Sequence, residues 1–458
     1  MRARSLILAI ALSLCGLAAT PASQAVTGPV PAKLVNLGPG VGGFMSSNIT
    51  YFATLAFESP AVSARVVKLG AQKRLYVSTV KGLSVYDVTD PTLPLLLGAV
   101  DFYNWENEDI AVSADGRWVL SSEFQGFLYT HIFEAITLPG GLVSLVLRGT
   151  MPLNAAHTIE CIDPACDWAY GSEGQIYDFR DKANPKSAGS WPGNGHHVTV
   201  EPGTGLVWTD TTPIRVLDVS DDPKAPIVIA ESDRTSMNQK KTAYQHNNLR
   251  PFPTDYNPRL TPEDIADPNL RPGEILLGEG ETNFGPSCGS GSGPFATYDL
   301  SNFDQPGAKP FKVVDVFRPI NGDYDGGDGD PAVNAMGCSG HWFDISPAST
   351  HEKIITSNGW YDHGTRVFEI DGKTAKIKQL GYFQPVVGEA SASYWIDDET
   401  IYTVDYARGI DILQFDADAP TPTRTQFDAS WLAKLHNYDP VADYAQWFCR
   451  TEGRFRIE

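Results

Sequence analysis

Short runs in which apolar and polar residues alternate recur along the chain, and each run ends near Asp, Asn, Gly or Pro. In the clearest copies, at 82–91, 175–185 and 214–223, the run reaches an Asp and then a turn that contains proline. A period of two, with many β-branched and aromatic residues, predicts half-buried β-strands. Looser copies lie at 295–302, 366–371 and 410–416. Helical periodicity is nearly absent before a C-terminal stretch at 431–449.

The copies recur at roughly 40–50 residues, and each unit holds four strand-sized runs, which is typical of a β-propeller. We count seven units, whose first strands are expected to begin near Ser63, Glu108, His157, His196, His246, His341 and Ala392. The prediction is therefore an all-β, seven-bladed propeller with four-stranded antiparallel blades, forming a single domain at 26–458. Segment 32–57 is expected to help close the ring, since an unclosed propeller exposes sheet edges. Insertions are predicted near 251–272 and 319–337, and a C-terminal extension at 417–458.

The repeated Val-Tyr-Asp-Val-Thr-Asp-Pro pattern at 85–91 resembles the LVIVD-repeat β-propellers, a family of exported proteins largely of unknown activity. This resemblance covers 62–415 and implies the fold, but it implies no chemistry. The run His-Asn-Asn-Leu-Arg-Pro at 246–251 is similar to selenium-binding, methanethiol-oxidase-like propellers. That resemblance implies a metal held by histidines of the channel, and it gives no substrate.

The N-terminus has the pattern of a signal peptide at 1–25. Arg2 and Arg4 precede an apolar run at 6–17, and small residues follow around Ala25. No later run is long and apolar enough to span a membrane. A net charge of −20 argues against nucleic acid and anionic lipid as partners. We therefore expect a secreted or periplasmic monomer whose partner is a small-molecule substrate or an extracellular ligand.

The cysteines that follow the signal peptide suit an oxidising compartment. Cys161 and Cys166 flank the turn of an expected hairpin and could close a small loop. Cys288 and Cys338 lie in glycine-rich connections and are a second candidate disulfide, which leaves Cys449 over. The pairing itself cannot be fixed from the sequence.

Four histidines occupy the same position of consecutive units, each at the start of a first strand. These residues are His157, His196, His246 and His341. First strands of a propeller line its axis, so the four imidazoles are expected to meet at one mouth of the channel. Neutral imidazoles without thiolate suit Fe, Cu or Zn. For each single histidine the alternative is an ordinary hydrogen bond to a neighbouring loop. His197 follows His196 directly, and alternation sends its side chain elsewhere, although a register error of one residue would exchange the two.

Acidic residues are expected behind the histidines, because the ends of second strands lie at the same rim as the starts of first strands. An outer carboxylate would accept the free ring N–H of a ligand and fix its tautomer. The predicted outer acids are Glu123, Glu173, Asp210 and Glu281. Glu108 continues the histidine column one unit earlier, as a further ligand or a general base. His363 is a candidate for substrate contact or an extra ligand, with an ordinary turn histidine as the alternative.

A loop at 321–330 alternates carboxylates with glycines. Its acids are Asp323, Asp325, Asp328 and Asp330. Hard oxygen ligands on a turn suit Ca²⁺, although the spacing departs from the EF-hand pattern. A solvated acidic loop is the alternative.

Two functions from different classes follow from these residues. The first is an exported metalloprotein with a transition-metal site at the channel mouth, acting as a metal-dependent oxidoreductase. Metal storage without turnover is a variant of it. The second is a non-catalytic extracellular binding or adhesion propeller, stabilised by calcium.

Overall fold

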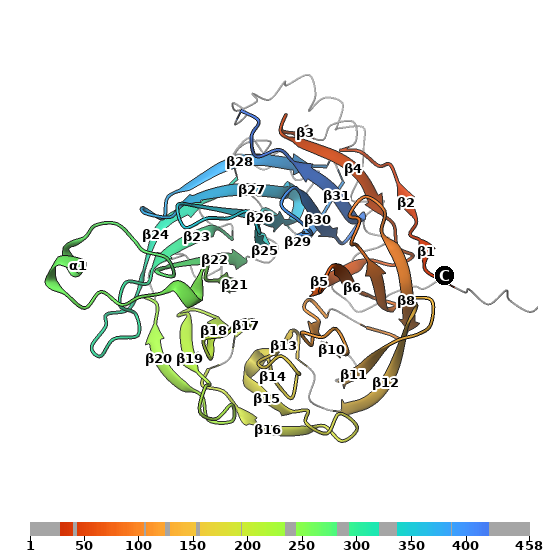
Figure 1. Ribbon diagram of the computed structural model, residues 1–458, viewed down its shortest axis with the longest axis horizontal. Coiled ribbons are helices and arrows are strands. Elements are labelled where there is room, and N and C mark those ends of the chain that lie inside the picture. Colours follow the sequence, from red (N-terminus) through yellow and green to blue (C-terminus); the bar gives the residue numbers. More distant parts are fainter. Residues whose placement is uncertain are drawn as a thin grey trace, which may run out of the picture.

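A computed structural model describes residues 28–39, 44–104, 107–123, 129–152, 156–193, 195–233, 244–281, 293–319, 337–385 and 387–420. Its strands form seven antiparallel sheets. The sheets stand like blades around a central axis (Figure 1). The predicted seven-bladed β-propeller is therefore confirmed, and within the described residues almost no helix is present.

The first three blades each begin with an inner strand at the axis and continue outward in chain order. Blade 1 consists of β5 (Ala61–Leu69), β6 (Gln72–Thr79), β7 (Gly82–Asp87) and β8 (Leu95–Asp101). Blade 2 consists of β9 (Ala111–Val112), β10 (Trp118–Ser122), β11 (Tyr129–Thr137) and β12 (Val143–Pro152). Blade 3 consists of β13 (Ile159–Cys161), β14 (Trp168–Gly171), β15 (Gln175–Asp178) and β16 (Lys186–Ser190).

The next three blades repeat this order. Blade 4 consists of β17 (His197–Glu201), β18 (Leu206–Asp210), β19 (Arg215–Asp218) and β20 (Ile227–Glu231). Blade 5 consists of β21 (Tyr244–Leu249), β22 (Ile275–Glu281), β23 (Phe295–Asp299) and β24 (Lys312–Phe317). Blade 6 consists of β25 (Gly340–Ile345), β26 (Lys353–Trp360), β27 (Gly364–Asp371) and β28 (Ile377–Gln384).

Blade 7 joins the two ends of the described chain. Its inner strands β29 (Ala390–Trp395), β30 (Thr400–Asp405) and β31 (Gly409–Phe415) come from the C-terminal side, and its outer strand β4 (Ile49–Leu55) comes from the N-terminal side. The register places Phe415 opposite Ile49 and Ile410 opposite Leu55. Figure 1 shows this N-terminal strand beside β31, the last strand of the described residues. Three short strands cover further outer edges: β1 (Val30–Pro31) on β8, β2 (Leu34–Val35) on β4, and β3 (Phe44–Met45) on β28.

The hydrophobic core lies between neighbouring blades, because each sheet buries both of its faces. One cluster packs Leu75 and Val77 of blade 1 against Tyr402 and Ile412 of blade 7. Similar clusters occur between other adjacent blades. This packing fixes each inner strand, and therefore the residues at its start, relative to the axis.

The described helices are short and lie outside the blades' strands. They are the α-helix α1 (Pro262–Ala266), in the predicted insertion at 251–272, and the 3₁₀ turns Ser172–Gly174, Pro253–Asp255 and Tyr361–His363. Among the described residues, none of the helices has the length and apolar character needed to cross a membrane.

Candidate metal centre

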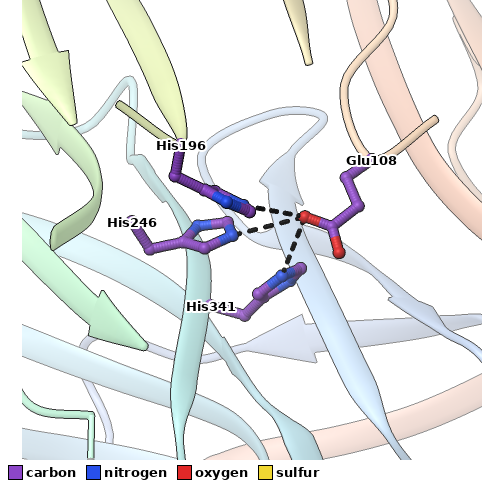
Figure 2. A group of neighbouring side chains, drawn as sticks. All are labelled: Glu108, His196, His246 and His341. Atoms are coloured by element: carbon purple, nitrogen blue, oxygen red, sulfur yellow. Dashed lines mark hydrogen bonds and ion pairs between the residues drawn. The ribbon is translucent and has the colours of Figure 1, made fainter. Parts of the chain in front are cut away.

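The five residues at the start of consecutive inner strands converge on the axis. His246 and His341 lie within β21 and β25, and His196 directly precedes β17. His157 and Glu108 lie two and three residues before β13 and β9. The blades therefore present four imidazoles and one carboxylate to a single point, and Figure 2 shows three of the imidazoles around Glu108.

One carboxylate oxygen stands at the centre of this group. Oε2 of Glu108 lies 2.9 Å from Nε2 of His157 and 3.0 Å from Nε2 of His196. The same oxygen lies 3.4 Å from Nε2 of His246 and 3.3 Å from Nε2 of His341. Glu108, His196, His246 and His341 each offer a ligand atom, and these four atoms all lie within 4.8 Å of one another. This group could hold a metal ion.

The hydrogen bonds of His341 show which of its nitrogens faces the group. Nδ1 lies 2.8 Å from the backbone carbonyl oxygen of Ser391, and a carbonyl only accepts. Nδ1 therefore carries a proton. Burial lowers the pKa of His341, but the Glu108 carboxylate raises it above its usual value, so without a metal ion Nε2 faces that carboxylate as a donor. One carboxylate oxygen has about two lone-pair sites, so it cannot accept hydrogen bonds from four imidazoles.

Burial sets the protonation states in this group. It lowers the pKa of His246 well below the usual range, helped by the neighbouring charges of His341 and His196. Burial also lowers the pKa of His196. The Glu108 carboxylate is disfavoured by burial, but the imidazoles of His157 and His341 outweigh this effect and hold its pKa well below the usual range. Without a metal ion, positive charge on His157 and His341 therefore balances the ionised Glu108 carboxylate. A metal ion would take the place of that charge, because imidazoles bind metal in their neutral form.

Exposure differs among the histidines. The side chains of His246 and His341 have no exposed surface, whereas 14% of His196 and 11% of His157 is exposed. The rings of Trp342 and Tyr361 cover the buried pair, with centroids 4.6 Å from that of His246 and 4.7 Å from that of His341. Within the described residues, the partly exposed side of the group is therefore the one formed by His157 and His196.

A second polar group lies next to the first, formed by the chain neighbours of Glu108 and His196. His197 directs Nε2 at Asp109 Oδ2, at 2.9 Å, and Nδ1 at Asp210 Oδ2, at 2.7 Å. Burial lowers the pKa of His197, but the hydrogen bonds to the two carboxylates raise it to about 9. The register therefore places His196, and not His197, in the group around Glu108.

The four expected outer acids take different positions. Asp210 contacts His197 instead of His196, and Glu123 lies beside His131, with Oε1 3.7 Å from its Nε2. Glu281 lies near the group, with Oε2 3.7 Å from Nε2 of His246. The side chain of Glu173 lies outside the described residues. The partner of His341 is a backbone carbonyl instead of a carboxylate, and no sequence pattern signals such an acceptor.

His363 is buried in the 3₁₀ turn Tyr361–His363, where its Nδ1 lies 2.8 Å from Asp362 Oδ1. It does not belong to the compact group around Glu108. Tyr361, in the same turn, donates a hydrogen bond of 2.7 Å to Glu281 Oε1. This contact orients the carboxylate beside His246.

The remaining predicted sites are only partly within the described chain. A disulfide joins Cys161 and Cys166. Cys338 is also disulfide-bonded, and Cys288, its expected partner, lies outside the described residues. The expected calcium ligands Asp323, Asp325, Asp328 and Asp330 lie outside them too, as do the predicted signal peptide at 1–25 and residues 421–458.

Comparison with known proteins assigns no family to this chain. No family model matches the chain, and no curated protein matches it. Among solved structures, the β-propeller domain of Cps50 (Swd1) from Myceliophteria thermophila is similar, with a TM-score of 0.49 and 10% sequence identity over 80% of this chain and 100% of that one. The resemblance to LVIVD-repeat propellers stays a prediction.

Proposed function

We propose that this propeller is an exported metal-dependent oxidoreductase with its metal at the Glu108 group. The observation that carries the proposal is the convergence of four imidazole Nε2 atoms on one carboxylate oxygen, at 2.9–3.4 Å. The donation from His341 Nδ1 to Ser391 supports it, because it fixes the ring so that Nε2, the other ring nitrogen, faces the carboxylate.

The donor set fits a divalent transition metal. His196, His246, His341 and Glu108 supply three nitrogens and one oxygen, and no thiolate belongs to the group. Such a set suits Fe, Cu or Zn. The carboxylates of Glu108 and Glu281 carry two negative charges beside the site, which balance a divalent cation in a buried position.

The surrounding residues would hold the ligands in place and limit access. Ser391 orients His341, Tyr361 orients Glu281, and Trp342 covers His246. Fe or Cu, when bound, would supply one-electron and dioxygen chemistry. Substrate would approach past His157 and His196, the two partly exposed histidines.

Elemental analysis of three purified proteins tests the metal site. The wild type and His351→Ala are expected to carry near-stoichiometric Fe, Cu or Zn, and His246→Ala is expected to carry none. His351 is the matched control because it is half exposed and pairs with Asp255, away from the group. Failure of the wild type to bind metal even after reconstitution would overturn the proposal and leave a binding propeller.

Redox titration separates an oxidoreductase from a site that only stores or structures metal. Protein loaded with Fe or Cu is expected to show one reversible potential that disappears in His246→Ala. If the native metal is Zn alone and added Fe or Cu gives no reversible couple, the oxidoreductase assignment is wrong and only metal binding stands.

Export rests on the signal-peptide pattern at 1–25 and agrees with the Cys161–Cys166 disulfide, since such bonds persist in oxidising compartments. Mass spectrometry of the protein recovered outside the cytoplasm should give a mature chain that begins near residue 26. Recovery of the full-length chain from the cytoplasm, with Cys161 and Cys166 reduced, would contradict export.

A further inference from the structure

The second polar group has the residue types of a metal site, but positively charged side chains of the protein occupy the position of a metal ion. Asp109, Glu160 and His197 offer ligand atoms within 4.8 Å of one another. Arg65, however, forms ion pairs with both Asp109 and Glu160, and its Nη2 lies 3.2 Å from Asp109 Oδ2. The guanidinium thus takes the position between the carboxylates that a metal ion would need.

His197 acts as the second cation of this group. Both of its ring nitrogens face carboxylate oxygens, Nε2 toward Asp109 and Nδ1 toward Asp210. Carboxylates only accept, so both nitrogens must donate. Asp210 is further held by Asn248 of β21, the strand that carries His246. Asp109, Glu160 and Asp210 therefore all have partners within the protein, without a metal ion.

This group is linked covalently to the metal-site candidate at two points. Asp109 directly follows Glu108, and His197 directly follows His196. The Asp109–His197 contact of 2.9 Å therefore joins the blade 2 and blade 4 segments that supply two of the four ligands. A second connection runs parallel to it, because Asp109 forms a backbone bridge with Thr158, whose Oγ1 donates to the carbonyl of His196 at 2.8 Å.

We propose that Asp109 and His197 are positioning residues that hold Glu108 and His196 in the arrangement a metal ion requires. The inference rests on the proposed function. Neither residue would touch the metal. Their contact restricts both ligand segments. Partners that hydrogen-bond metal ligands directly are worth about 10- to 100-fold in metal affinity, and we expect an effect of the same order here.

Binding of Co(II) to the full chain tests this role, because its visible spectrum reports ligand geometry independently of turnover. His197→Gln is expected to bind one equivalent about 10- to 100-fold more weakly than the wild type, with a changed spectrum. Asp411→Asn is the matched control: it alters another buried carboxylate, which accepts from Arg408 and is not a member of either group. This control should keep wild-type affinity and spectrum.

A second pair of variants keeps the test decisive if His197→Gln does not fold. Asp109→Asn retains an oxygen that accepts from His197, whereas Asp109→Ala does not. The Asn variant is expected to keep affinity close to that of the wild type, and the Ala variant to lose about 10- to 100-fold. Equal affinity of both with the wild type would overturn the positioning role.

Two failures can be told apart. If neither the wild type nor His246→Ala binds Co(II), the proposed metal site itself is wrong. If His246→Ala abolishes binding while His197→Gln and Asp109→Ala bind as the wild type does, the metal site stands and only the positioning role is wrong.

Discussion

Among the single residues of the site, His157 differs from the other three histidines. Its Nε2 lies 2.9 Å from Glu108, but it falls outside the compact group of four ligand atoms and is partly exposed. We expect His157→Ala to keep near-stoichiometric metal, while His341→Ala loses it. Equilibrium dialysis against Zn(II) measures both. Loss of metal from His157→Ala, with retention in His341→Ala, would show that His157 is a ligand and His341 is not.

Glu108 is central to the site because its Oε2 contacts all four imidazoles. Glu108→Gln keeps the shape but removes the negative charge, so metal affinity should fall by at least the 10- to 100-fold that loss of an outer partner causes. Competition with a chromophoric chelator measures the change. Glu123→Gln, near His131, is the control and should leave affinity unchanged.

The histidine column could be predicted because one side chain recurs at the same position of each repeat. Other parts of the site could not. The choice between His196 and His197 depends on a register of one residue, and only the contacts of His197 with Asp109 and Asp210 settle it. The acceptor for His341 is the main chain of Ser391, and any residue type would offer that carbonyl.

Among the elements, the hairpin that contains Cys161 and Cys166 is held by a short cross-link, with a sequence separation of 5. In the chain-entropy description, a loop of this size stabilises the fold by about 2 kcal/mol. The double variant Cys161→Ala and Cys166→Ala should therefore lower the free energy of unfolding by about that amount. Urea denaturation under oxidising conditions measures it, and an unchanged midpoint would show that the hairpin packing alone suffices.

The N-terminal strand β4 completes blade 7, so its removal should be far more harmful than its length suggests. Deleting residues 28–57 would leave β31 without its partner and expose a hydrophobic sheet edge. We expect aggregation or loss of cooperative unfolding. Deleting only 28–31, which removes the two-residue strand β1, should have a small effect. Thermal unfolding compares the two, and similar curves would contradict the closure role.

The blades themselves follow from period-two patterns, but their boundaries do not. Glu108 was expected to begin a strand, whereas β9 starts at Ala111 and contains two residues. Just before this strand, the Glu108 side chain belongs to the metal-site candidate and the Asp109 side chain belongs to the second polar group. Local propensity cannot show such contacts, because the partners come from other blades. The register of β4 against β31 depends likewise on residues at the two ends of the chain.

For the whole molecule, buried carboxyl groups should make the fold less stable as the pH rises from about 4 to about 7. Burial raises the pKa of Glu160 and Asp405 to about 7 and that of Asp344 to about 6, from ordinary values of about 4. Between the ordinary and the raised pKa, the folded state binds more protons than the unfolded state, so the free energy of unfolding falls as the pH increases.

Each unit of such a shift corresponds to about 1.4 kcal/mol. The net charge of −20 at pH 7 acts in the same direction, through repulsion. Because the lowered pKa values of His246 and His196 act in the opposite direction, the test isolates one carboxyl group. Asp405→Asn should make the urea midpoint fall less between pH 5 and pH 8 than it does in the wild type. The same pH dependence in both proteins would show that Asp405 is ionised at little cost in the folded protein.

The pairing of β4 with β31 also sets the order of events in folding. Ile49 and Phe415 are partners although 415 − 49 = 366 residues separate them, so the first strand made for blade 7 must wait for the last. Contacts so distant along the chain slow folding, because the entropy of closing a long loop is lost before the contacts that offset it have formed. A newly made chain can build its middle blades early, but the ring is sealed only after nearly the whole described sequence has been released. A version of the protein with its ends moved to a loop between two middle blades would close without that wait.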